Sequence, residues 1–316
     1  MDRFLKVNII YYSIGFAILI VIPFFVEKAW NDLVIEIYIM AIAASAANLM
    51  AGYSGMVSFG VAGFYGIGSY ITAILITRAG IPFEIAFLAG PLGAAILSIP
   101  IGWFCVRRTA IYFAMLSLAF SQLIYVIIFT WYSFTGGDDG IVGVQMPAYL
   151  NSTFSYYYFS LIILIVCLCA MWRLVNSPFG KTLQALRDNP DRAGFIGINV
   201  RRYQYSVYIV SSFFLAVAGS LQCGFNQNVF ADYAHWAKTF EITIVYLLGG
   251  IHNFIGPTIG SIIFIIANKI ITRHTEYWPI TLGIVIILIT IFMPNGVAGF
   301  VLSRLSGFKR EKERLL

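Results

Sequence analysis

The chain has 316 residues, of which 60% are hydrophobic and 11% are charged, and its formal net charge at pH 7 is +6. Because soluble proteins usually contain about 45–50% apolar residues, this composition excludes an ordinary globular protein and predicts an all-α, polytopic integral membrane protein. The positive balance does not indicate nucleic-acid binding, since basic residues in such chains gather in cytoplasmic loops.

Apolar segments separated by charges, Gly and Pro predict about ten transmembrane spans, with eight to ten as the expected range. The predicted spans are 9–26, 33–51, 59–77, 83–105, 111–132, 154–175, 205–223, 241–250, 255–271 and 279–300. The segment 241–250 is shorter than the roughly 20 residues that cross a bilayer. We interpret the start of the chain as a retained first span rather than a signal peptide. One transmembrane domain over residues 1–316 is therefore expected.

The orientation of these spans follows from the distribution of Lys and Arg, which concentrate in cytoplasmic loops. With the N-terminus inside, 15 of the 20 basic residues fall on the inner side, including those of a basic tail at 303–316. The outer side receives Lys28, Arg78, Lys238, Lys269 and Arg273. Both termini are therefore expected to be cytoplasmic.

Two glycine-rich stretches interrupt the apolar segments. The first, "GYSGMVSFGVAGFYGIGSY", covers residues 52–70, and the second, "LGGIHNFIGPTIGS", covers 248–261. Small residues allow helices to pack closely, but a broken helix also exposes backbone groups toward a water-filled path. Both interpretations stay open, and the second would place these residues in the substrate path: Ser58, Phe59, Gly60, Val61, Tyr65, Gly249, Gly250, His252 and Asn253.

The stretch 177–204 is unusually polar for this chain and is expected in the longest inner loop. Ser177 caps a predicted helix whose first turn contains Pro178, and the helix should end before Asn189, which starts a second short turn. Phe179, Leu183 and Leu186 form a narrow apolar stripe. The helix either rests on lipid headgroups or docks on a cytoplasmic partner, which Asp188 and Asp191 favour.

The sequence offers little for catalysis or metal binding. Its cysteines lie in or beside apolar runs and its histidines are scattered: Cys105, Cys167, Cys169, Cys223, His235, His252 and His274. We expect no catalytic residues and no metal site. Glu36 and Glu241 are placed near outer span ends, where they need only reach the interface. The chain also lacks a G-x-x-x-x-G-K-[ST] phosphate loop, so any ATP must be handled by another subunit.

Five ordered blocks between about residues 45 and 300 resemble the permeases of branched-chain amino acid ATP-binding-cassette transporters, and specifically the M-type permease of the Liv system. The blocks are "LMAGYSGMVSFGVAGFYGIGSY", "AIYFAMLSLAFSQ", "TGGDDGI", "SPFGKTLQALRDNPDRAGFIGINVRRYQ" and "LLGGIHNFIGPTIGS". The family usually has His where this chain has Val61, and small residues where it has His252 and Asn253. These departures leave the substrate open.

The resemblance implies a non-catalytic permease of a bacterial inner-membrane importer. The implied partners are a second homologous permease, two cytoplasmic ATPase subunits that use ATP and Mg, and a periplasmic substrate-binding protein, all around a lipid bilayer. It also implies that 177–199 is the coupling segment that docks on an ATPase. Its matching core is Gly180, Leu183, Ala185, Leu186, Arg187, Asp188 and Asn189. We therefore expect Asp at Leu183 or Leu186 to weaken docking.

Branched-chain or related amino acids are the implied substrates. Urea and amide importers share the blocks and remain an alternative. A self-sufficient channel or secondary transporter is the alternative from another class. An integral-membrane enzyme would need a converging nucleophile, base or metal set, which the sequence does not contain.

Overall fold

A computed structural model describes residues 28–107 and 110–274, together with positions 23, 280, 283, 296, 297 and 299. The described part is built almost wholly of helices. They are α2 (Lys28–Asn48), η1 (Leu49–Tyr53), α3 (Val61–Thr77), α4 (Phe83–Cys105), α5 (Ala110–Thr130), α6 (Tyr132–Thr135), α7 (Thr153–Asn176), α8 (Pro178–Asp188), α9 (Pro190–Phe195), α10 (Val200–Asn226), η2 (Ala231–Ala234), α11 (Trp236–Gly249) and α12 (Gly256–His274).

Five helical segments of the described part are long and apolar enough to cross a membrane. They are Lys28–Tyr53, α4, α5, α7 and α10, and the apolar helix α3 is shorter. Helices α11 and α12 occupy the predicted spans 241–250 and 255–271. The predicted spans 9–26 and 279–300 and the tail 303–316 lie outside the described ranges, apart from the isolated positions. The structure is therefore that of a polytopic helical membrane protein.

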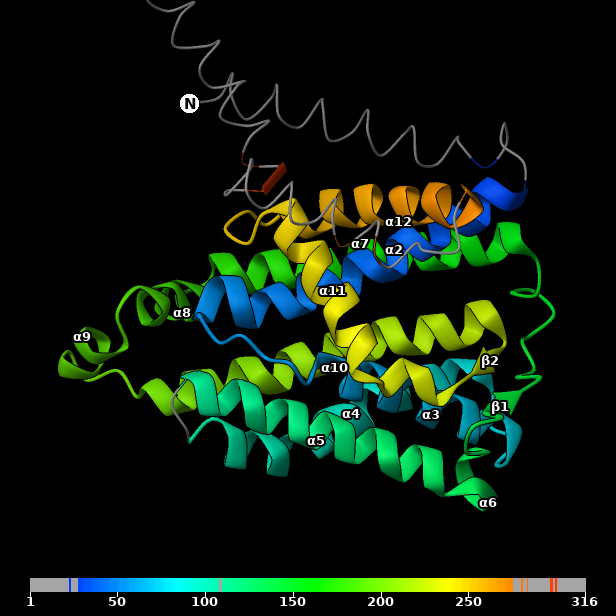
Figure 1. Cartoon of the computed structure of the whole chain (residues 1–316), viewed down its shortest axis with the longest axis horizontal. Helices are drawn as coiled ribbons and strands as arrows, with labels where there is room; N and C mark the ends of the chain where they lie inside the picture. The colour runs from blue at the N-terminus through cyan, green and yellow to red at the C-terminus, as the bar shows by residue number, and fades with distance from the viewer. Residues whose placement is uncertain are drawn as a thin grey trace, which may run out of the picture.

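Helices α2 and α10 form the centre of the bundle. Helix α10 packs against α2, α3 and α4, while α2 also packs against α7, α11 and α12, as Figure 1 shows. In the most apolar part of α2, 89% of the residues are buried, whereas the corresponding share in α5 is 22%. The outer helices therefore present the broad apolar surface that a bilayer or a second subunit would cover.

Helices α3 and α10 cross closely because both have glycine at the contact. A Cβ added at Gly219 would overlap the carbonyl oxygen of Tyr65, and one added at Gly68 would lie 2.6 Å from the Cα of Ala216. This contact is typical of helices that pack through small residues within membranes. Close packing, the first of the two interpretations of the glycine-rich stretch 52–70, therefore accounts for Gly68.

Between η1 and α3, residues 55–60 are not helical. The N–H of Phe59 donates to Ser117 Oγ of α5 (3.1 Å), and the N–H of Ala62 donates to Thr239 Oγ1 of α11 (3.1 Å). The ring of Phe59 stacks on that of Phe240, with 5.8 Å between centroids. Backbone N–H groups at and beside this non-helical segment thus find hydrogen-bond acceptors in the side chains of neighbouring helices. Non-helical backbone within a membrane bundle requires such partners.

The two ends of the bundle differ in structure. One end, here called the α8 end, contains α8 and α9, and the other contains α6 with the strands β1 (Ile141–Val142) and β2 (Asn228–Val229), as Figure 1 shows. The strands pair antiparallel with Ile141 opposite Val229. This pair is the β structure of the described ranges, and it is a small departure from the all-α expectation.

Candidate functional site

Helix α8 begins and ends where its sequence predicts. Ser177 Oγ accepts the N–H of Gly180 (3.3 Å), and Pro178 occupies the first turn. Asn189 takes an extended conformation before Pro190 and ends the helix, because a residue before proline disfavours the helical region. The side chain of Asn189 then caps α9 by accepting the N–H of Arg192 (2.9 Å). Helix α8 is therefore short, has a capping residue at its start and is bounded by a proline at each end. It is a well-defined helix rather than a flexible loop.

The apolar stripe of α8 faces the rest of this chain. Leu183 and Leu186 are fully or almost fully buried, at 0% and 2% exposure, and the ring of Phe179 stacks on Tyr203 of α10. The expectation that Leu183 and Leu186 contact a partner protein is therefore wrong, because their side chains anchor α8 to its own bundle. The remaining face of α8 and α9 is exposed and mixed in charge: Lys181, Ala185, Asp188, Asp191, Arg192 and Phe195.

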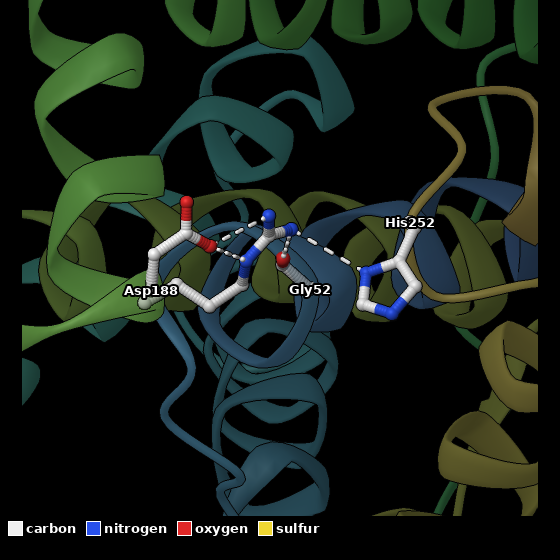
Figure 2. A network of polar contacts seen from close by, with 4 residues as sticks. Gly52, Asp188 and His252 are labelled. Carbon is white, nitrogen blue, oxygen red and sulfur yellow. Dashed lines mark hydrogen bonds and ion pairs between the residues drawn. The ribbon is translucent and has the colours of Figure 1, made fainter.

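Arg187 connects α8 to two other parts of the bundle. Its Nη1 donates to the carbonyl oxygen of Gly52 (2.9 Å), in η1 at the end of α2, and lies 3.4 Å from His252 Nδ1 in the turn between α11 and α12. Its Nε and Nη2 donate to Asp188 Oδ1 (3.2 and 3.0 Å). Figure 2 shows this network. The planar guanidinium group serves all three partners at once, which suits arginine better than lysine.

A cleft of about 510 Å³ lies beside this network at the α8 end. It is lined by α8 and α9, the segment after η1, the residues that follow α4, one residue of α5 and the start of α10. The charged lining residues are Arg107, Arg187, Asp191 and Arg201. The cleft is therefore predominantly basic.

A second cavity, of about 220 Å³, lies inside the helix bundle and is here called the central cavity. Its lining comes from α2, α3, α10, α11 and α12: Glu36, Ile39, Met40, Tyr65, Gln222, Lys238, Glu241, Phe264, Ile265 and Asn268. Lys238 Nζ pairs with Glu241 Oε2 at 2.7 Å, and Tyr65 donates to Gln222 Oε1 at 3.1 Å. Three charged side chains thus share one small cavity among packed helices.

The predicted substrate-path residues fall into separate groups. Tyr65 lines the central cavity. Ser58 and Gly60 are buried in the non-helical segment and Phe59 is half-buried there, while Val61 is buried at the start of α3. Gly249 and Gly250, with His252 and Asn253, lie at the end of α11 and in the following turn, near the α8 end. The structure does not bring the nine residues into one site.

The glycines of the second stretch belong to a helical hairpin rather than to a break within a span. A Cβ at Gly249 would overlap the carbonyl of Gly256, and a Cβ at Gly260 would lie 2.9 Å from the N atom of Gly249. Close crossing of α11 and α12 therefore explains these glycines. His252 is exposed beside Arg187, and within the described ranges no three His, Cys, Asp or Glu residues form a group that could hold a metal ion.

The sequence interpretation missed most of the central cavity. Glu36 and Glu241 were expected at outer span ends and Lys238 in an outer loop, but all three line the cavity together with Gln222 and Asn268. Helix α11 begins at Trp236, five residues before the predicted span. The spacing of Lys238 and Glu241 at i and i+3 was the available signal, because such a pair can neutralise itself on one helix face.

The comparisons with known proteins place this fold in a family. The sequence model described as "Branched-chain amino acid transport system / permease component" matches residues 31–293. The chain is 23% identical over 302 residues to the "High-affinity branched-chain amino acid transport system permease protein LivM" of Escherichia coli K12, covering 87% of this chain and 71% of the relative. It is 25% identical over 298 residues to the corresponding LivH protein of Salmonella typhimurium LT2, covering 87% and 96%.

An archaeal relative and one solved structure complete the comparison. The "Probable branched-chain amino acid transport permease protein LivM" of Methanocaldococcus jannaschii is 24% identical over 250 residues, covering 73% of this chain and 69% of the relative. The structure titled "PsaBC from Streptococcus pneumoniae in complex with Fab" has a TM-score of 0.44 and 16% identity, covering 87% and 92%.

The fold defines the class of protein as a polytopic membrane protein with several apolar helices. The family match covers most of the chain, so the protein belongs to the permease components of branched-chain amino acid transport systems. The relatives are permease proteins of transport systems.

Proposed function

We propose that this chain is the passive permease subunit of an ATP-driven importer for branched-chain or related amino acids. The observation that carries the proposal is the position of Arg187, which connects α8 to the end of α2 and to the turn between α11 and α12. A rigid helix with an exposed outer face and an inward connection is what a subunit needs to transmit movement from a partner to its own interior.

In this account α8 and α9, within the coupling segment 177–199, dock on a cytoplasmic ATPase through their exposed face. The buried side chains of Leu183 and Leu186 make the segment move with the bundle. Arg187 then passes the movement to Gly52, three residues before the non-helical segment 55–60. Gly180, Ala185, Asp188 and Asn189 complete the proposed coupling core. The ATPase subunits bind ATP and Mg, and this chain binds neither.

The proposed substrate path includes the central cavity and the non-helical segment. Tyr65 belongs to the first, whereas Ser58, Phe59, Gly60 and Val61 belong to the second or directly follow it. A second homologous permease forms the other side of the path, and a periplasmic binding protein delivers the amino acid. The family and the apolar helices support a location in the bacterial inner membrane, for which we propose both termini on the cytoplasmic side.

Co-purification tests this assembly. The tagged chain, expressed with its genomic neighbours and purified in mild detergent, should bring down ATPase subunits and a second permease. The chain purified alone should hydrolyse no ATP, because its sequence has no phosphate loop. ATP hydrolysis by the isolated chain, or its recovery without any ATPase from cells that express one from the neighbouring genes, would contradict the proposal.

A further inference from the structure

We infer that the central cavity is a binding site for the zwitterionic head group of an α-amino acid. This inference rests on the proposed function and adds to it a specific site and the role of each lining group. The first observation is the placement of charge. Glu36 on α2 and Lys238 and Glu241 on α11 line a cavity of about 220 Å³ within the bundle.

Charged side chains are costly inside a helix bundle unless they have partners. Lys238 and Glu241 partner each other at 2.7 Å, with side-chain exposures of 21% and 32%. The carboxylate of Glu36 makes no hydrogen bond or ion pair with any described residue, although its side chain is half-buried. Among the described lining residues, the cavity thus carries two carboxylates and one ammonium group. Lys269, next to the lining residue Asn268, also acts electrostatically on Glu36, but the carboxylate of Glu36 has no direct partner and can accept hydrogen bonds from an incoming cation.

The ammonium group of an amino acid can pair with the carboxylate of Glu36. Glu36 would accept its N–H groups, with Glu241 nearby, and charge-assisted hydrogen bonds of this kind are stronger than neutral ones. Among the described residues that line the cavity, the neighbouring Lys238 carries the only positive charge. Lys238 can therefore attract the carboxylate of the same ligand without leaving its ion pair with Glu241.

Two amides provide further donors for that carboxylate. Gln222 accepts the Tyr65 hydroxyl with its Oε1, and Asn268 accepts the Thr272 hydroxyl with its Oδ1 (3.2 Å). In each amide the oxygen is therefore engaged, and the NH₂ group carries two donors. One donor of Gln222 already serves the hydroxyl of Tyr233, which leaves the other for the ligand. The cavity offers carboxylate acceptors on α2 and α11 and donors on α10, α11 and α12, and a zwitterion requires both kinds of group.

The surface that the cavity offers is mainly polar. Ile39 and Met40 of α2 and Phe264 and Ile265 of α12 also line it, but they are at most 8% exposed and present little apolar surface. The volume of about 220 Å³ lies below the range of about 300–1,000 Å³ that is typical of sites for drug-sized ligands. A small polar head group therefore suits the cavity best.

The test is binding of radiolabelled leucine to the purified importer complex, lacking only the binding protein, in lipid nanodiscs. Unlabelled leucine should displace the label, whereas 4-methylpentanoate, which lacks the ammonium group, and isopentylamine, which lacks the carboxylate, should displace it at least about tenfold less well. Glu36→Gln keeps the size of the side chain and removes its charge. It should weaken leucine binding by about tenfold or more, to the level of 4-methylpentanoate.

Glu84→Gln is the matched control, because Glu84 is exposed in the first turn of α4 and lies outside the cavity. It should bind leucine as the unmodified chain does. Equal binding by the Glu36→Gln complex would overturn the inference, as would equal displacement by isopentylamine, which would indicate a simple cation site. A monodisperse elution profile of each variant complex excludes misfolding as the cause of lost binding.

Uptake measurements separate this inference from the proposed function. Leucine uptake that requires the chain but is unchanged by Glu36→Gln would keep the importer and reject the amino-acid site. Charge-selective leucine binding at the cavity, without any ATP-dependent uptake by the complex, would keep the site and reject the importer.

Discussion

At the scale of single residues, Arg187 has the largest set of connections at the α8 end. It donates to a carbonyl of η1, lies next to His252 and pairs with Asp188. The pair with its neighbour Asp188 is largely exposed and contributes little on its own. The bond to Gly52 is different, because it joins residues 135 positions apart. Arg187 therefore acts mainly as a connection between elements.

Arg187→Ala should reduce leucine uptake by roughly tenfold or more, since hydrogen bonds to charged groups contribute about 1.5–3 kcal/mol. ATPase recovery in a pull-down should stay near normal, because the exposed face of α8 is unchanged. Arg187→Lys should rescue uptake only partly, as a single ammonium group cannot reproduce the planar fork. Arg173→Ala, which alters an exposed cation in the last turn of α7 and outside the proposed docking face, is the control. Undiminished uptake by Arg187→Ala would remove the proposed connection.

At the scale of elements, α8 has an inner face and an outer face with different roles. Leu183 and Leu186 are buried against the bundle, while Ala185 lies exposed between them in sequence. The inner face holds the helix in place, and the outer face is left for a partner. Substitutions on the two faces should therefore fail in different ways.

Leu183→Asp should lower the amount of folded chain in the membrane. Truncation of a buried leucine alone costs about 2–5 kcal/mol, and a buried unpaired carboxylate adds to that cost. Ala185→Asp should leave the membrane level near normal but reduce recovery of the ATPase subunits, because it places a charge on the proposed docking face. Quantitative immunoblots of membranes and pull-downs measure both. The reverse result, with Leu183→Asp well folded and Ala185→Asp unstable, would contradict the assignment of the faces.

The elements also show how much the sequence could predict. The bounds of α8 follow from Ser177, Pro178 and Asn189, because caps and prolines act locally. Spans 83–105 and 59–77 were predicted closely, since long apolar runs are strong signals. Which face of α8 is buried could not be predicted, because an amphipathic stripe fits its own bundle, lipid or a partner equally well.

The central cavity could not be predicted for a related reason. Its charged residues come from α2 and α11, which are some 200 positions apart in the sequence, so only tertiary packing brings Glu36 to Glu241. Each charge alone looks like a residue at a span end that reaches for water. The apolar run of α11 is short, so the sequence did not reveal that the helix begins at Trp236. Lys238 was therefore predicted to lie in a loop.

At the scale of the whole molecule, the chain combines an exposed outer helix at one end with a charged cavity inside the bundle. The relatives LivM and LivH both match across most of this chain, as expected for a member of the permease family. The cleft beside Arg187 and the central cavity would then be the two places that respond to a partner and to the substrate.

The most direct test of the importer is leucine uptake into proteoliposomes that contain this chain, the second permease and the ATPase subunits. We predict uptake only when ATP is supplied on the ATPase side and the loaded binding protein on the other side, with no uptake by this chain alone. ATP-independent uptake by the isolated chain would instead indicate a channel or secondary transporter. ATP-driven uptake of urea or an amide in place of leucine would contradict the proposed substrate.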